Sequence, residues 1–220
     1  LNNMLNKILI STGGSGGHVI PATILYEHLS EKNELFISTD KRGLKFLDKN
    51  KYKIEIINIP RLSNIFLLPL NLLIVIFLTI KSFFLLKNKK INILFSTGGY
   101  MSLPLILAAK ILNLKIYLLE PNLVLGKANR LFLKSCKKIL CYTDQIKNFP
   151  ENLRHKIVTI FPLVRKDFYE LKDENINAKF NILVIGGSQG ADIFDKELKK
   201  KIVNLSKEFS LKITQQTNKN

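Results

Sequence analysis

Three glycine-rich loops are the parts of this sequence best suited to chemistry. GGSGGH (13–18), TGGY (97–100) and GGSQGA (186–191) each follow a short apolar run and precede a helix-like segment. Glycine lets the backbone turn sharply and approach a ligand closely, and the free N–H groups at a helix start attract phosphate. One such loop could be an ordinary tight turn. Three of them, each at the carboxyl end of an expected strand, indicate a phosphate-bearing ligand.

His18 ends the first loop, where its imidazole could act as a general base toward an attacking hydroxyl. The alternative is that it only hydrogen-bonds to backbone or phosphate. The loop is not the dinucleotide-binding fingerprint, because Val19 stands where the third glycine is required. Asp40, at the end of the second expected strand, could still hold a ribose, which leaves a nicotinamide enzyme as an alternative. The Walker pattern is absent, which argues against a P-loop ATPase.

Short apolar runs alternate with helix-period segments through the first 143 residues. This alternation predicts βαβ units and a mostly parallel sheet, so the expected fold class is α/β and doubly wound. The expected strands are 7–12, 34–39, 53–59, 91–97, 115–120 and 137–143. The expected helices are 19–33, 42–50, 102–112 and 126–135.

The later part of the chain predicts a second domain. Residues 1–164 are expected to form the N-terminal domain, and the charged stretch 165–179 an interdomain linker. A new pattern of strand (180–185), helix (191–208) and strand (211–214) then begins, so 180–220 is expected to start another Rossmann-like domain. About 40 residues cannot bury both faces of such a sheet, so this domain is expected to be truncated.

A hydrophobic stretch, 65–86, lies between two expected strands of the first domain. It is close to the ~20 residues that cross a bilayer, and Arg61, Lys87, Lys89 and Lys90 flank it. Three interpretations remain: a crossing helix, a buried core helix, or an exposed apolar helix that dips into an anionic membrane surface through 65–90. A crossing helix would place two halves of one domain on opposite sides of the membrane.

The charge balance favours an anionic partner. The chain has 34 Lys and Arg against 17 Asp and Glu, a formal net charge of +17, although genomic drift could account for part of the excess. An RNA-binding protein would fit the charge, but no recognition signature or aromatic-basic interleaving is present, so no nucleic acid partner is expected. Cys136 and Cys141 show no metal-ligand spacing and are expected to be ordinary reduced thiols.

Four segments together resemble the MurG family, which is glycosyltransferase family 28 with the two-domain GT-B fold. They are GGSGGHVIPA (13–22), STGGYMSLPLILAA (96–109), LLEPNLVLGKANRLF (118–132) and LVIGGSQGA (183–191). They run in the family's order across nearly the whole chain. The combination is specific, although no single motif is.

This resemblance implies an inverting transfer of N-acetylglucosamine from UDP-N-acetylglucosamine to undecaprenyl-diphosphoryl-N-acetylmuramoyl-pentapeptide. That reaction converts lipid I to lipid II in peptidoglycan synthesis. The resemblance also implies a peripheral protein at the cytoplasmic face of the inner membrane, with residues 1–164 as the acceptor and membrane-associating domain. No cofactor is expected, and no metal site is visible in the sequence.

The family's functional positions fall on residues in all three glycine loops and in the 118–132 segment. The resemblance makes His18 the candidate base. It implies substrate binding by Ser15, Gly16, Gly17, Asn122, Arg165 and Ser188. It implies shaping of the acceptor site by Gly98, Gly99, Tyr100, Glu120 and Asn129. It implies a donor diphosphate loop of Gly186, Gly187, Gln189 and Gly190.

The sequence departs from the family pattern at two of these motifs. The family's EQN reads Glu120-Pro121-Asn122, and its NPVR reads FPLVR over 161–165, with one extra residue before Arg165. The family's ribose contact would lie beyond Asn220, so residues 1–220 alone are expected not to transfer sugar. The alternative function is a membrane-recruiting acceptor subunit of a split, two-chain glycosyltransferase.

Overall fold

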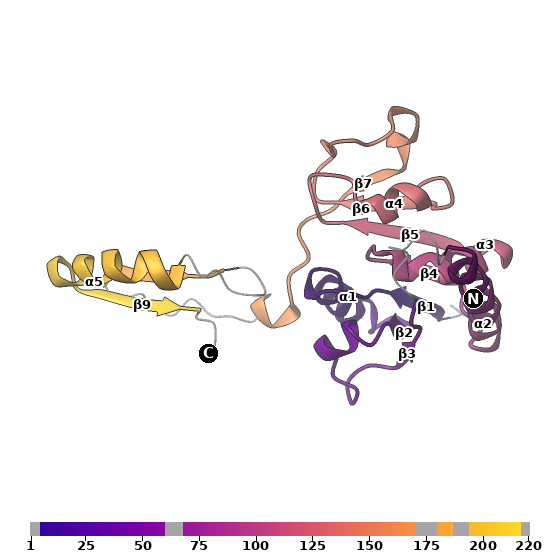
Figure 1. Cartoon of the computed structure of the whole chain (residues 1–220), viewed down its shortest axis with the longest axis horizontal. Helices are drawn as coiled ribbons and strands as arrows, with labels where there is room; N and C mark the ends of the chain where they lie inside the picture. The colour runs from indigo at the N-terminus through magenta and orange to yellow at the C-terminus, as the bar shows by residue number, and fades with distance from the viewer. Residues whose placement is uncertain (1–4, 60–67, 170–179, 187–193, 217–220) are drawn as a thin grey trace. The chain divides into compact units, whose positions relative to one another are not determined.

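A seven-stranded parallel sheet forms the centre of the first unit of the protein (Figure 1). The structure is a computed structural model that describes residues 5–59, 68–169, 180–186 and 194–216. The sheet has the order β3-β2-β1-β4-β5-β6-β7, and every neighbouring pair is parallel. Its strands are β1 (Asn6–Ser11), β2 (Asn33–Thr39), β3 (Ile54–Ile56), β4 (Ile93–Ser96), β5 (Lys115–Glu120), β6 (Lys138–Cys141) and β7 (Ile157–Thr159).

Helices cover both faces of this sheet, which confirms the predicted α/β fold class. The helices are α1 (Gly16–Leu29), α2 (Leu68–Asn88), α3 (Leu103–Ile111) and α4 (Lys127–Phe132). The core on one face packs Ile8 and Ile10 of β1 against α1, and the core on the other packs Leu9 against α2, α3 and α4. Because both strand faces are buried, the strands read as continuous apolar runs rather than as alternating ones.

The order of the strands places a topological switch point between β1 and β4. From β1 the chain adds β2 and β3 toward one edge of the sheet. It then returns to place β4 on the other side of β1 and adds β5, β6 and β7 toward the opposite edge. Ser11 at the end of β1 is in register with Ser96 at the end of β4. The two glycine loops that follow these residues therefore start side by side, at the point where open α/β sheets bind ligands.

The predicted helix over 42–50 is wrong. The structure has a short 3₁₀ turn at Gly43–Phe46 instead. The side chain of Asp40 accepts the Gly43 amide at the start of this turn, at 2.8 Å. The side chain of Asp48 accepts the Asn50 amide at 2.8 Å, which forms a second local turn. Side chains of this kind compete with the backbone bonds of a longer helix.

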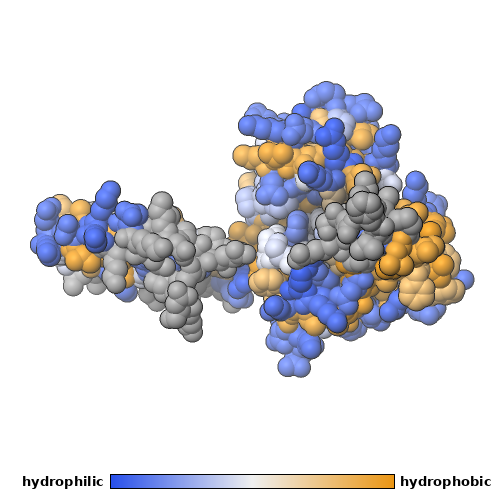
Figure 2. Space-filling view, in the orientation of Figure 1, coloured by the Kyte–Doolittle hydropathy of each residue, from blue (hydrophilic) through white to orange (hydrophobic). Residues whose placement is uncertain are grey.

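The described part of the hydrophobic stretch, from Leu68 on, forms α2, which is neither wholly buried nor free to cross a membrane; residues 65–67 lie outside the described residues. Val75, Leu78 and Leu86 are buried in the core beside α3. Among the described residues, only α2 is long and apolar enough to cross a membrane. If α2 left the domain to do so, however, it would expose the core that it covers. Its opposite face stays exposed, and Figure 2 shows hydrophobic residues gathered over α2 and α3, at the right of the view. The exposed apolar residues there include Leu72, Leu73, Ile76, Phe77, Ile80, Phe84 and Ile111.

A second unit begins at Glu170, inside the predicted linker 165–179. Its described part consists of β8 (Phe180–Val184), a π-helical turn at Phe194–Leu198, α5 (Lys199–Glu208) and β9 (Leu211–Gln215). The two strands pair in parallel, as a βαβ unit requires. The predicted linker residues 165–169 belong to the first unit, where a 3₁₀ turn, Lys166–Tyr169, contacts α1 through an edge-on ring contact between His28 and Tyr169.

Candidate functional site

The first two glycine loops are joined through His18 and Thr97. His18 Nδ1 lies 2.9 Å from the carbonyl oxygen of Thr97, and the Thr97 hydroxyl donates to the His18 carbonyl at 3.0 Å. A carbonyl can only accept, so Nδ1 must carry the proton. In the neutral ring this leaves the lone pair on Nε2, which can accept a proton from a ligand.

Gly98 must be glycine for both conformation and space. Its φ is +95°, a region that other residues rarely adopt. A Cβ at this position would lie 3.3 Å from Cε1 of His18 and 3.6 Å from Nδ2 of Asn129. The following Gly99 also has a positive φ of 84°. The second loop thus passes directly against the imidazole without a side chain between them.

Three buried serines link the points where these two loops leave the sheet. Ser11 of β1 and Ser96 of β4 both donate to the hydroxyl of Ser102, at 3.0 and 2.8 Å. The Ser96 hydroxyl in turn accepts the Gly98 amide at 3.2 Å. Because these groups lie away from water, a lost bond would leave a buried polar atom unpaired. The network therefore fixes where the second loop leaves the sheet.

Glu120 organises the loop that follows β5. Its side chain is 2% exposed, and its two oxygens accept four hydrogen bonds. One oxygen accepts the amide and the side-chain NH₂ of Asn122, at 3.2 and 3.0 Å. The other accepts the Gly126 amide at 2.8 Å and Nδ2 of Asn129 at 3.0 Å. One carboxylate thus fixes the conformation of the loop, the position of the start of α4 and the side chain of Asn129 within that helix.

The orientation of the Asn129 amide follows from its partners. Nδ2 donates to Glu120 and to the Leu119 carbonyl, so Oδ1 is the other end of the group. Asn129 is 3% exposed, and its Oδ1 has no hydrogen-bond partner among the described residues. A buried acceptor without a partner is costly, by roughly 1–3 kcal/mol. Oδ1 is therefore available to a ligand donor.

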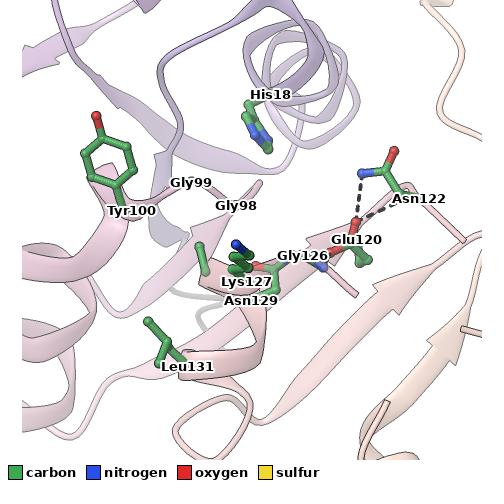
Figure 3. A pocket seen from close by; sticks show the side chains of 11 residues that line it. His18, Gly98, Gly99, Tyr100, Glu120, Asn122, Gly126, Lys127, Asn129 and Leu131 are labelled. Atoms are coloured by element: carbon green, nitrogen blue, oxygen red, sulfur yellow. Dashed lines mark hydrogen bonds between the residues drawn. The ribbon is translucent and has the colours of Figure 1, made fainter. Parts of the chain in front are cut away.

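These groups surround one cavity of about 300 Å³ at the carboxyl ends of β1, β4 and β5 (Figure 3). Of the predicted site residues it brings together His18, Gly98, Gly99, Tyr100, Glu120, Asn122 and Asn129. Gly126, Lys127, Ala128 and Leu131 line it as well, although none of these four was among the predicted site residues. The signal was present, because Gly126 and Lys127 stand at the start of an expected helix just after the Glu120 motif.

The first loop leaves two amides free at the start of α1. Ser15 is the N-cap residue, and its carbonyl accepts the amides of His18 and Val19. The amides of Gly16 and Gly17 form no hydrogen bond to any residue that the structure describes. Gly17 and the Ser15 side chain are exposed beside them. Free donors at the positive end of a 14-residue helix suit a phosphate.

Asp40 does not present a carboxylate for a ribose. It is 4% exposed, and one of its oxygens accepts the amides of Gly14 and Gly43, at 3.0 and 2.8 Å. The other pairs with Arg42 Nε at 2.8 Å. Burial alone would raise the pKa of Asp40, but the two amides and the guanidinium outweigh it and hold that pKa below its ordinary value. Its carboxylate supports the loop, which removes the main reason for a nicotinamide enzyme.

The remaining predicted residues lie apart from the cavity or outside the described chain. Arg165 is exposed and does not line the cavity. Gly186 follows β8 in the second unit. Gly187, Ser188, Gln189 and Gly190 lie outside the described residues. The binding roles predicted for these positions stay predictions.

The fold and the site define an open α/β domain with a cavity at the switch point of its sheet. A model of the glycosyltransferase family 28 N-terminal domain matches residues 8–141. The chain therefore belongs to glycosyltransferase family 28. The match includes the first two loops and the Glu120 segment, so the predicted family resemblance is confirmed.

Curated relatives extend the likeness over nearly the whole chain. Over 217 residues the chain is 52% identical to the UDP-N-acetylglucosamine--N-acetylmuramyl-(pentapeptide) pyrophosphoryl-undecaprenol N-acetylglucosamine transferase of Pelagibacter ubique, covering 98% of this chain. It is 33% identical over 222 residues to the protein of the same name from Rickettsia felis. The chain spans 61% of the length of each of these relatives.

Solved structures show the same fold. MurG from Acinetobacter baumannii matches with a TM-score of 0.71 at 23% identity, over 96% of this chain and 60% of that one. A glycosyltransferase from Rickettsia africae matches with a TM-score of 0.66 at 16% identity, over 97% of this chain and 69% of that one. At these identities the likeness supports the architecture alone.

Proposed function

We propose that this chain is the acceptor-binding part of an inverting transferase. The complete enzyme moves N-acetylglucosamine from UDP-N-acetylglucosamine to undecaprenyl-diphosphoryl-N-acetylmuramoyl-pentapeptide, as the name of its 52% identical relative describes. The observation that carries the proposal is the convergence of loops from β1, β4 and β5 on one cavity lined by His18, Glu120 and Asn129. The second unit, with Gly186 after its first strand, is assigned to the donor.

In the proposed reaction a hydroxyl of the N-acetylmuramoyl group attacks the anomeric carbon of the donor sugar. A new C–O bond forms there, while the bond from that carbon to the β-phosphate oxygen breaks and UDP leaves. Nε2 of His18 takes the hydroxyl proton, since Nδ1–H is held by Thr97. The free amides of Gly16 and Gly17 provide donors for phosphate oxygens of the bound substrates.

Glu120 and Asn129 are assigned to the acceptor sugar. The four hydrogen bonds that Glu120 accepts come from Asn122, Gly126 and Asn129, so its part is to hold Asn122 and Asn129 in place. Asn129 Oδ1 then accepts a hydrogen bond from a hydroxyl or amide N–H of the acceptor. Lys127, exposed at the rim of the cavity, adds a cation toward the acceptor diphosphate.

We also propose that the exposed apolar face of α2 places the enzyme on the cytoplasmic surface of an anionic membrane. The acceptor carries a polyprenyl chain, so the active cavity must lie near lipid. Exposed apolar patches of this kind mark membrane or protein contacts, and Lys81, Lys87 and Lys90 stand exposed on or just after the same helix to meet anionic headgroups.

Transfer assays on the intact protein that contains this chain test the proposal. The assay supplies UDP-N-acetylglucosamine labelled in the sugar and an acceptor with a shortened prenyl chain, and it follows label in the lipid product. Transfer that requires both substrates is the expected result. Hydrolysis or epimerisation of the donor without transfer would contradict the proposal, and so would transfer to acceptors that lack the N-acetylmuramoyl group.

A further inference from the structure

A second cavity of about 300 Å³ lies beside the first, at the carboxyl ends of β2 and β3. It is lined by Asp40, Lys41, Arg42, Asn58, Ile59 and Tyr100. Tyr100 lines both cavities, so the two share a wall. In Figure 3 the Tyr100 hydroxyl points away from Glu120 and Asn122, out of the His18 cavity. The function proposed above gives this second cavity no role.

Each side-chain acceptor atom of the second cavity already accepts at least one hydrogen bond. Both oxygens of Asp40 are taken by the amides of Gly14 and Gly43 and by Arg42. Oδ1 of Asn58 accepts the Lys41 amide at 2.9 Å. The Tyr100 oxygen accepts Arg42 Nη2 at 3.1 Å. A ligand that brought hydrogen-bond donors would find these oxygens engaged.

Several donor groups of the same cavity have no partner among the described residues. Nη1 of Arg42, Nζ of Lys41 and Nδ2 of Asn58 form no hydrogen bond or ion pair with the residues that the structure describes. The Tyr100 hydroxyl accepts from Arg42, so its own proton is also available. Asp40 offsets one of the two positive charges, and Lys41 is an exposed cation that pairs with no acid in the described part of the chain. A lining of free donors with one net positive charge suits an anion.

We propose that this cavity is an anion subsite that binds a carboxylate or phosphate group of the same acceptor whose sugar occupies the His18 cavity. The inference rests on the proposed function, because that acceptor carries both a diphosphate and a peptide with carboxylates. Arg42 also holds Tyr100 between the two cavities, so occupation of the subsite bears directly on the wall of the His18 cavity. The subsite thereby adds acceptor affinity without contacting the reacting atoms.

The kinetic test uses Lys41→Met and a matched control, Lys49→Met. Both lysines are exposed and near in sequence, but Lys49 does not line the cavity. In the intact enzyme we expect Lys41→Met to raise the acceptor KM by roughly five- to tenfold, as for a partly exposed charge-assisted hydrogen bond. The KM for UDP-N-acetylglucosamine should not change, and Lys49→Met should behave as the wild type. Arg42→Lys, which keeps a cation beside Asp40, should show the same acceptor effect.

Two acceptors identify the anion. If the bound group is a peptide carboxylate, the effect of Lys41→Met disappears with an acceptor that lacks the peptide. If it is the diphosphate, the effect persists. Equal acceptor KM values for Lys41→Met and Lys49→Met with both acceptors would overturn the subsite.

A binding measurement separates this inference from the proposed function. Thermal unfolding of the intact protein is followed with added pyrophosphate and, separately, with succinate, since a ligand that binds only the folded state raises Tm. We expect one of the two anions to stabilise Lys41→Met less than Lys49→Met. A protein that transfers no sugar but shows this difference would refute the function and keep the subsite. Equal stabilisation of both variants by both anions would refute the subsite.

Discussion

His18 and Thr97 hold each other by two hydrogen bonds that run in opposite directions between α1 and the end of β4. The ring nitrogen donates to the Thr97 carbonyl at 2.9 Å, and the Thr97 hydroxyl donates to the His18 carbonyl at 3.0 Å. One bond fixes the ring and the other fixes the backbone that carries it. A general base must be placed in this way before its proton affinity matters.

Replacing His18 by Gln tests the base. Gln can still donate to the Thr97 carbonyl, but it cannot take a proton, so we expect kcat to fall by about 10²–10⁴. The free energy of unfolding should change by no more than about 1 kcal/mol. Steady-state kinetics and urea unfolding measure the two effects. His155→Gln, at an exposed position of a 3₁₀ turn, is the control and should leave both unchanged. A His18→Gln enzyme with wild-type kcat would exclude the base role.

Gly98→Ala tests the close approach of the second loop. The alanine would have to adopt a φ of +95°, and its Cβ would lie 3.3 Å from the His18 ring. We expect a loss of about 1–3 kcal/mol in the free energy of unfolding, with a lower kcat because the ring is displaced. Gly17→Ala is the matched control, since Gly17 is helical and its added Cβ would meet only ordinary contact. Thermal unfolding of the two variants should differ clearly, and equal Tm values would contradict this account.

Glu120→Gln tests the carboxylate that orders the β5 loop. All four partners of Glu120 are donors, so a Gln NH₂ group would face a donor at one of its two ends. We expect a loss of about 2–3 kcal/mol in unfolding free energy and a higher acceptor KM. Glu151→Gln removes an exposed carboxylate that pairs with Arg154, and it should cost less than about 1 kcal/mol. If both variants unfold alike in urea, Glu120 does not organise the loop.

The sequence predicted the strands of the sheet well because burial on both faces leaves a local signal. Residues 115–120 carry an apolar run that coincides with β5. β7 was missed, because it has only three residues and forms through pairing with β6, which lies about 18 positions earlier. Pairing of that kind is decided by tertiary contacts rather than by local composition.

Most of the cavity could be predicted from motifs, but the contacts inside it could not. The motifs placed His18, Gly98 and Glu120 at the ends of strands, and parallel strands bring such ends to one edge. Nothing local indicates that Asp40 turns inward to accept the Gly14 amide. Nor could the sequence show that the side chain of Arg165 is exposed and does not line the cavity.

Because its two thiols are buried, we expect the protein to lose free energy of unfolding at alkaline pH. Burial, with the negative charge of Glu120, raises the pKa of Cys141 to about 12, and burial also raises the pKa of Cys136. The pKa of an unfolded thiol is about 8.5, so the folded state keeps its thiol protons to higher pH. The stabilisation is thus complete below about pH 8.5 and is lost as pH rises toward 12. Urea unfolding at a series of pH values should show a smaller alkaline loss for Cys141→Ala than for the wild type. The native thiols should also resist alkylation at neutral pH.

Glu substitutions at two exposed phenylalanines test whether the membrane binds the apolar face of α2 or any exposed apolar side chain. Phe77 lies on α2, and Phe161 lies in the loop after β7. Both rings are exposed, Phe77 by 66% and Phe161 by 93%, but only Phe77 stands in the apolar face of α2. Inserting one such side chain into lipid contributes roughly 1.5–3 kcal/mol, so Phe77→Glu should weaken binding to phosphatidylglycerol vesicles by about tenfold or more. Phe161→Glu should bind vesicles as the wild type does. Added salt should weaken vesicle binding by all three proteins, because salt screens the attraction of Lys81, Lys87 and Lys90 to the headgroups. Co-sedimentation with vesicles measures these affinities. Equal losses in the two variants would mean that α2 is not the membrane-binding face.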